Sequence, residues 1–209
     1  MLDKAEMAAL VLDVLQSRYP HARPHLAHRS AWELLAATIL SAQCTDERVN
    51  RITPELFRRL PDPAAFAAAA VEEVEELIRS AGFYHNKARS LIAAAGGIMR
   101  DFGGEVPSRM EDLLRLDGVG RKTANVVLSG AFGLNEGLAV DTHVARISRR
   151  LGLTAAADAR EIEADLLPLF PRREWGGVNH RMVSFGREVC KARKPLCADC
   201  PLGVPCPRL

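Results

Sequence analysis

Hydrophobic residues recur with the spacing of a helix face along most of the chain, and glycine, proline and aspartate separate the repeats. Val71, Val74, Leu77 and Ile78 are typical, since positions three, four and seven apart fall on one side of an α-helix. Gly82 then follows as a stop. The pattern predicts an amphipathic helix here and a largely helical protein overall.

Capping residues predict where several helices begin. Residues 30–33 (Ser-Ala-Trp-Glu) form a capping box before an apolar run that extends to Leu40. Thr53-Pro54 and Asp62-Pro63 each place an N-cap residue before a proline suited to the first turn. Residues 108–111 (Ser-Arg-Met-Glu) form a second capping box.

Alternating patterns typical of strands are rare. Residues 138–140 (Leu-Ala-Val) are strand-like but too short to build a sheet, and no internal repeat or long linker interrupts the chain. We therefore predict an all-α fold.

Composition places the chain among globular proteins, with 48% hydrophobic and 26% charged residues in a length of 209. The longest apolar run, residues 64–71, is far shorter than the roughly 18 residues of a membrane span. Asp3 and Glu6 stand where a signal peptide carries only bases. We expect a cytoplasmic protein with no membrane partner.

The formal net charge of +2 names no partner, but its distribution is uneven. Residues 181–209 hold six basic side chains against two acidic ones, whereas residues 72–76 hold four glutamates. A basic patch opposite an acidic side suits a polyanion such as DNA. Ordinary solvated helix faces are the alternative explanation.

A tight turn lies between two helical patterns at residues 116–123 (Leu-Asp-Gly-Val-Gly-Arg-Lys-Thr). A helix that begins near Arg121 would direct its first N–H groups outward, and such groups bind a phosphate without reading a base. A plain interhelical turn is the alternative, but the adjacent Lys122 favours function. The residues expected to contact DNA here are Gly118, Val119, Gly120 and Thr123.

Asp141 lies within Val-Asp-Thr-His, followed by several arginines. Its carboxylate suits the N-cap of the next helix, which by itself is a structural role. His143 is then expected to be an ordinary helix residue.

Four of the five cysteines crowd the C-terminal end with the spacing C-x6-C-x2-C-x5-C. A cytoplasmic chain is not expected to keep two disulfides, so the pattern predicts a four-thiolate metal site. The single C-x2-C pair matches neither the usual zinc spacing nor the common ferredoxin run, and the metal stays open. Cys44 stands apart and is expected to act as a small buried hydrophobe. The predicted ligands are Cys190, Cys197, Cys200 and Cys206.

Taken in order, these motifs resemble the endonuclease III family of helix–hairpin–helix DNA glycosylases, over nearly the whole chain. The segments that carry the resemblance are residues 40–46, 82–84, 104–107, 116–128 and 140–143 and the four C-terminal cysteines.

The resemblance implies a two-lobed all-α fold, with DNA bound in the cleft between the lobes. Residues 24–135 would form a six-helix barrel lobe that carries the hairpin. Residues 1–23 and 136–209 would form a discontinuous second lobe, in which the four cysteines hold a [4Fe–4S] cluster.

The implied activity is removal of oxidised pyrimidines from double-stranded DNA, followed by β-elimination at the abasic site through a lysine Schiff base. The catalytic residues would be Lys122 and Asp141. The neutral amine of Lys122 attacks the sugar, and burial and the positive end of its helix are expected to disfavour the ammonium form. Asp141 would stabilise positive charge on the sugar. The protein is expected to act as a monomer in the nucleoid.

Gln43 and Phe83 match the positions from which this family fills the space left by an extruded base. The family more often has leucine at the position of Phe83 and proline at that of Asp117, and one extra residue lies within 133–137. A core position is the alternative for Phe83. Phosphate contacts outside the hairpin would come from Lys191, Arg193 and Lys194.

Two other functions are compatible with parts of the pattern. A monofunctional mismatch glycosylase of the same superfamily shares the hairpin and the cysteines but generally lacks the lysine. A non-catalytic iron–sulfur DNA-binding module needs neither Lys122 nor Asp141.

Overall fold

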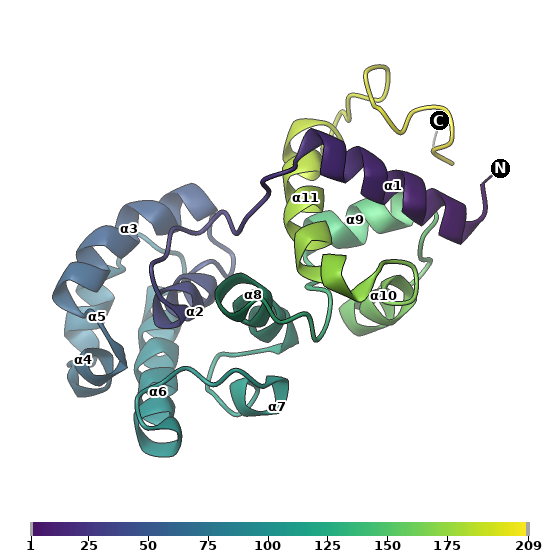
Figure 1. Cartoon of the computed structure of the whole chain (residues 1–209). Coiled ribbons are helices and arrows are strands. Elements are labelled where there is room, and N and C mark those ends of the chain that lie inside the picture. The colour runs from purple at the N-terminus through teal and green to yellow at the C-terminus, as the bar shows by residue number, and fades with distance from the viewer. Residues whose placement is uncertain (1, 208–209) are drawn as a thin grey trace. The chain divides into compact units, whose positions relative to one another are not determined.

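The structure, a computed structural model, describes residues 2–207, and all their regular elements are helical (Figure 1). The prediction of an all-α fold is confirmed. The elements are α1 (Lys4–Arg18), α2 (Ala31–Leu40), α3 (Asp46–Arg59), α4 (Pro63–Ala68), α5 (Val71–Leu77), α6 (Tyr84–Phe102), α7 (Met110–Leu113), α8 (Arg121–Phe132), α9 (Thr142–Arg150), α10 (Ala159–Leu166), the 3₁₀ turn η1 (Arg172–Glu174) and α11 (Trp175–Glu188).

The chain divides into two compact units. The hairpin unit is Pro24–Leu134 and holds α2 to α8, of which α7 is a single four-residue turn. The cysteine unit combines the described residues up to Arg23 with those from Asn135 onward, and it holds α1, α9, α10, η1 and α11.

In the hairpin unit the long helix α6 packs against α2, α4 and α5. Its buried face is built from small and branched residues, which allow close approach of the neighbouring helices. Trp32 of α2 meets Phe66 of α4 edge to face, with ring centroids 5.0 Å apart. The buried residues of α6 include Ala88, Leu91, Ala94, Ala95 and Ile98.

Two of the caps predicted for the hairpin unit are present. The Ser30 hydroxyl accepts a hydrogen bond from the Glu33 amide at 3.1 Å, and the Asp62 carboxylate accepts one from the Ala65 amide at 2.8 Å. The carboxylate of Glu33 reaches the amide of Arg29 at 2.7 Å, one residue before the cap. The local pattern therefore predicted the starts of α2 and α4 correctly.

Two other predicted starts are wrong. Thr45 caps α3, which runs through Thr53 and Pro54 because its buried face continues past the proline to Leu56 and Phe57. The box at residues 108–111 does not form, since α7 begins after Arg109 and has no side-chain cap. In both places the packing of the helix outweighs the local capping signal.

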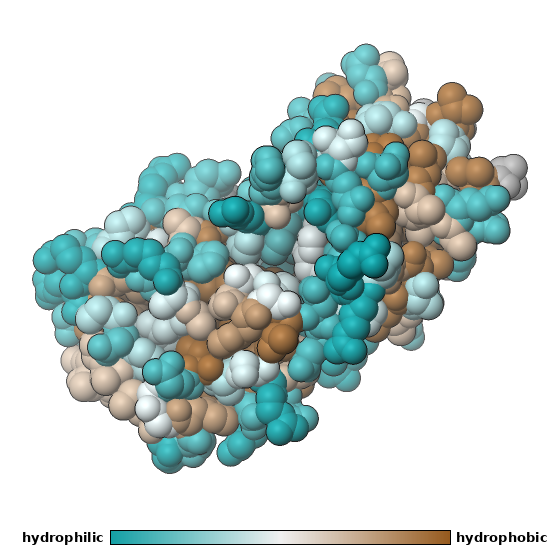
Figure 2. Space-filling view, in the orientation of Figure 1, coloured by the Kyte–Doolittle hydropathy of each residue, from teal (hydrophilic) through white to brown (hydrophobic). Residues whose placement is uncertain are grey.

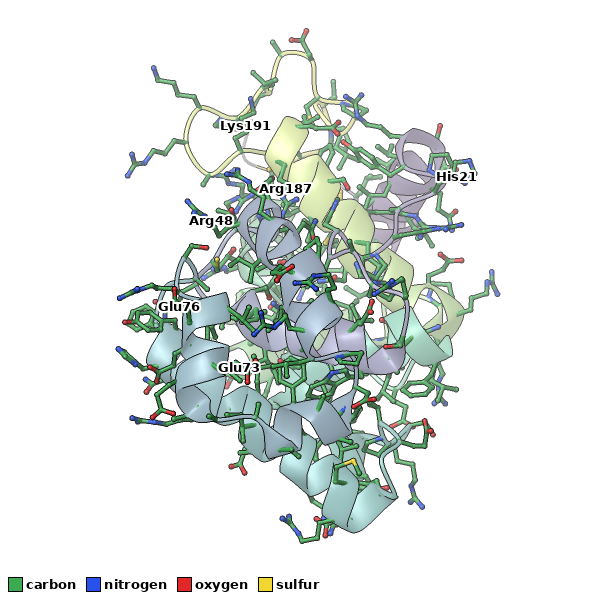
Figure 3. All side chains as sticks on the ribbon, turned by 90° about the vertical axis from the view of Figure 1, so that its left-hand side faces the viewer. His21, Arg48, Glu73, Glu76, Arg187 and Lys191 are labelled. Carbon is green, nitrogen blue, oxygen red and sulfur yellow. The ribbon has the colours of Figure 1, made fainter. Side chains whose placement is uncertain are left out.

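Two of the four acidic residues of α5 form ion pairs with arginines. Glu73 accepts from Arg59 at 3.3 Å and Glu76 from Arg79 at 3.2 Å. Figure 3 shows Glu73 and Glu76 on this helix. The acidic stretch is thus a helix face with ion pairs, and the basic patch of residues 181–209 stays a prediction for DNA contact.

In the cysteine unit, α11 lies beside both α1 and α9 (Figure 1). Residues on the apolar faces of all three helices belong to one core. Buried members of this core are Val11, Leu15, Ile147, Met182 and Phe185.

Within residues 2–207, no helix is both long enough and apolar enough to cross a membrane. The face drawn in Figure 2 mixes hydrophilic and hydrophobic side chains over both units.

The hairpin that joins α7 to α8 rests on α6. Gly118 has a φ of 74°, and a Cβ built there would lie 2.9 Å from the Cβ of Ser90. A residue with a side chain would therefore be strained both by its backbone and by its neighbour. Gly120 differs, because its φ is −94° and a Cβ there would have no atom within 4 Å.

Replacing Gly118 by alanine should therefore lower the free energy of unfolding by about 2–4 kcal/mol, from left-handed strain and overpacking. Gly120→Ala is the matched control and should cost about 1 kcal/mol or less. Urea unfolding followed by circular dichroism measures both. Equal stabilities of the two variants would contradict the contact with Ser90.

Candidate active site and metal centre

The first turn of α8 combines an open backbone with a basic side chain. Gly120 is the N-cap, and no side chain caps this helix. Lys122 is exposed and Thr123 is half-buried. Because the first N–H groups of a helix have no partner within it, this end is suited to an oxygen anion.

The hairpin unit contains two lysines, and only their environments distinguish them. Lys87 is 6% exposed, and its Nζ has no hydrogen-bond partner among the described residues. Burial lowers the pKa of its ammonium group. Lys122, in contrast, is exposed. The expected burial of Lys122 is therefore wrong for the free protein, since the second position of α8 faces solvent.

Gln43 and Phe83 share an unusual backbone conformation. Their φ angles are 52° and 58°, in the left-handed region that costs a residue with a side chain about 1–2 kcal/mol. Both are exposed, Phe83 at 64%, so a core position for Phe83 is excluded. A Cβ at Gly82 would lie 3.7 Å from the Gln43 carbonyl oxygen, which places the two segments side by side.

Strained residues of this kind persist where the surrounding structure holds them, and they cluster at functional sites. Phe83 is the N-cap of α6, while Gln43 lies two residues before the N-cap of α3. The sequence carries no signal for the strain, because neither residue is glycine or asparagine.

Asp141 caps α9 as predicted. Its Oδ1 accepts hydrogen bonds from the amides of His143 and Val144, both at 2.8 Å, and the residue is half-buried. The capping bonds use one carboxylate oxygen and fix the plane of the group, while Oδ2 takes no part in the cap. Asp141 belongs to the cysteine unit and Lys122 to the hairpin unit.

The four C-terminal cysteines line one pocket in the cysteine unit. Each is half-buried and free of disulfide bonds. Burial raises the pKa of the Cys200 thiol, and the thiols of Cys190, Cys206 and Cys197 raise it further. The apolar part of the wall consists of Leu151, Phe185, Val189, Pro195, Leu196 and Leu202.

This donor set fits an iron–sulfur cluster. Four soft sulfur ligands in an apolar setting are what such a cluster uses, and a bound cation would favour the thiolate form that burial alone disfavours. Within the described residues, no three His, Cys, Asp or Glu side chains are grouped so that they could share one metal ion. The four thiols line one pocket, which is an arrangement suited to a multi-iron cluster and not to a single ion.

The loop after α11 carries the three basic residues that the sequence analysis assigned to phosphates. Lys191, Arg193 and Lys194 are all exposed, and Lys194 adopts a left-handed φ of 51°. Figure 3 shows Lys191 on this loop, just beyond the end of α11 that carries Arg187. Their exposure leaves all three side chains accessible to a ligand.

Sequence reasoning missed several residues that the structure brings to these sites. It gave no role to Lys87 or to the arginines Arg146 and Arg150, which contact the loop at Cys190. The basic run after Asp141 was the one sequence signal for these arginines. A local pattern does not show their partners, which lie about 40 residues away along the chain.

Comparison with known proteins agrees with this geometry. Residues 36–172 match the HhH-GPD superfamily of base excision DNA repair proteins, and residues 190–204 match the iron–sulfur binding domain of endonuclease III. The chain is 52% identical to endonuclease III of Synechocystis sp., covering 99% of this chain and 94% of the relative. It is 46% identical to that of Bacillus subtilis, covering 91% and 87%.

Among solved structures, the chain is similar to a trapped endonuclease III–DNA covalent intermediate described as an estranged-adenine complex. The TM-score is 0.94 at 44% identity, covering 100% of this chain and 97% of the other. The chain therefore belongs to the endonuclease III family within the HhH-GPD superfamily, and it is a base excision repair DNA glycosylase with a [4Fe–4S] cluster.

Proposed function

We propose that this enzyme removes oxidised pyrimidines from double-stranded DNA and then cleaves the strand at the abasic site by β-elimination. The observation that carries the proposal is the contrast between the two lysines of the hairpin unit. Lys87 is buried, whereas Lys122 stands exposed on the first turn of α8, where a sugar can reach it. The similar endonuclease III structure is of a covalent DNA intermediate.

In this proposal the Lys122 amine attacks the sugar C1′, the damaged base leaves, and the resulting iminium permits β-elimination of the 3′ phosphate. The amine must first lose its proton. The positive end of α8 disfavours the ammonium form, and DNA packed over the exposed side chain would remove its water.

Asp141 is proposed as the second catalytic residue. A carboxylate stabilises the positive charge that develops on the sugar as the base departs. The cap on α9 supports this role, because the bonds to Oδ1 hold the group in one orientation while Oδ2 stays outside the cap. Capping and catalysis are thus compatible in one side chain.

The remaining contacts are proposed to hold the DNA backbone. The amides at Gly118 and Gly120, with Thr123, would bind a phosphate, and the open space beside Gly120 supports a close approach there. The Val119 amide donates to the Leu116 carbonyl at 3.2 Å, so Val119 would contribute by holding the turn in shape. Lys191, Arg193 and Lys194 would add salt-dependent attraction.

Gln43 and Phe83 would fill the gap left by the extruded base.

We expect the enzyme to bind duplex DNA that contains damaged pyrimidines or abasic sites. We also expect it to act as a monomer, in the cytoplasm at the nucleoid. The four cysteines of the pocket are the proposed cluster ligands.

Lys122→Ala should reduce strand cleavage at an abasic site by more than about 10³-fold, because no other exposed amine lies in the hairpin unit. Borohydride should trap the wild-type protein on abasic duplex but not the variant. Lys4→Ala, which removes an exposed lysine from α1, is the control and should be trapped normally.

Undiminished trapping of Lys122→Ala would assign the Schiff base to another residue. A wild-type protein that released bases but neither cut nor trapped abasic duplex would instead be a monofunctional glycosylase. A protein without either activity would fit the non-catalytic binding module.

Phe83→Ala should slow base release from a damaged duplex by about tenfold, since a stacking side chain contributes roughly 1–3 kcal/mol. Cleavage at a preformed abasic site should change less, because there is no base to extract. Phe83→Leu should restore most of the activity. Equal loss of both activities would argue against the proposed role.

Cys197→Ser should lower the iron content and the visible absorption of the purified protein and reduce its stability, because cluster binding contributes to folding. Cys44→Ser, in the hairpin unit, is the matched control and should retain the full iron content. Equal iron in both variants would remove Cys197 from the ligand set.

A further inference from the structure

Two arginines one turn apart on α9 hold the loop that follows α11. Arg146 Nη2 donates to the carbonyl oxygens of Cys190 at 3.0 Å and Gly186 at 3.2 Å. Arg150 donates to the carbonyl oxygens of Lys191 at 2.7 Å and Ala192 at 3.0 Å. Because residues i and i+4 lie on one helix face, both arginines bind the loop from the same side.

Arg150 differs from Arg146 in that its side chain also reaches sulfur. Its Nη1 lies 3.3 Å from Cys190 Sγ and donates toward it. The backbone of the same residue contacts a second cysteine, since Cys206 Sγ lies 3.8 Å from the Arg150 carbonyl oxygen. Arg150 also forms part of the wall of the cysteine pocket.

The close packing of α9 on α11 brings the arginines of α9 within hydrogen-bond distance of the loop at Cys190. A Cβ at Gly186 would lie 2.8 Å from Arg146 Nη2 and 3.1 Å from Ile147 Cδ1, so the absent side chain lets the helices approach. Within residues 2–207, Arg150 forms no ion pair with a carboxylate, and its contacts are loop carbonyls and sulfur.

We propose that Arg150 is a positioning residue for the cluster, which fixes the Cys190 ligand and raises the reduction potential of the iron–sulfur centre. The proposal rests on the four-cysteine ligand set proposed above. Hydrogen bonds to ligand sulfur stabilise the reduced form, which carries more negative charge, and a planar guanidinium can serve sulfur and two carbonyls together.

The adjacent Arg149 is the matched control for Arg150. Arg149 is exposed, and its Nε donates to Ala145 of the same helix at 3.0 Å. It therefore carries the same charge on the same turn without touching the loop. Lysine at position 150 would keep the charge, but its single ammonium cannot reproduce the three-way contact.

The experiment uses full-length protein purified with its cluster, as wild type, Arg150→Gln, Arg150→Lys and Arg149→Gln. Iron is counted first, the reduction potential is then measured by protein-film voltammetry, and cluster loss to a chelator is followed by visible absorption. Both Arg150 variants should show a lower potential and cluster loss at least about tenfold faster, the usual effect of removing a partner of a metal ligand. Arg149→Gln should match wild type in both.

An unchanged potential in both Arg150 variants would overturn the proposal. So would equal shifts in Arg149→Gln and Arg150→Gln with Arg150→Lys at the wild-type value, since charge alone would then explain them. If Arg150→Gln loses its cluster during purification, the potential of Arg150→Lys decides. A wild-type protein without iron would refute the ligand set itself, and the proposal with it.

Discussion

The close contact between the hairpin and α6 is the constraint on which the chemistry of the hairpin unit depends. Gly118 can lie against Ser90 only because it has no side chain and tolerates a positive φ. Gly97 of the same helix similarly makes room for Leu116, whose Cδ2 would lie 3.1 Å from a Cβ there. The turn is therefore held at two points, and the start of α8 is set by them.

The same helix also orients the proposed gap-filling residue. Phe83 is the N-cap of α6, and the backbone at Gly82, just before it, lies beside the Gln43 carbonyl. One helix thus places an exposed aromatic ring at its start and the turn proposed to bind a phosphate against its middle. Building such a site on a helix limits the motion of both groups.

In the cysteine unit α9 has a comparable role. Its N-terminus orients the Asp141 carboxylate, and its last turn holds the loop of Cys190 through Arg150. The proposed cluster ligand Cys190 is thereby tied to the helix that presents a proposed catalytic group. The loop between Cys190 and Cys197 has no helix or strand of its own, so its shape depends on these side-chain contacts.

The sequence by itself determined the local features: the helical class, the caps at Ser30, Asp62 and Asp141, the turn before Lys122 and the four thiols. These depend on residues within a few positions of one another, so short patterns report them. Only the tertiary structure decided which residues are strained, buried or paired across the chain. It buried Lys87 and exposed Lys122, carried α3 through Pro54, gave Gln43 and Phe83 left-handed backbones, and brought Arg150 to a cysteine sulfur. Each of these outcomes results from packing between distant segments, whose free energy exceeds the local preferences of about 1 kcal/mol that a sequence pattern expresses.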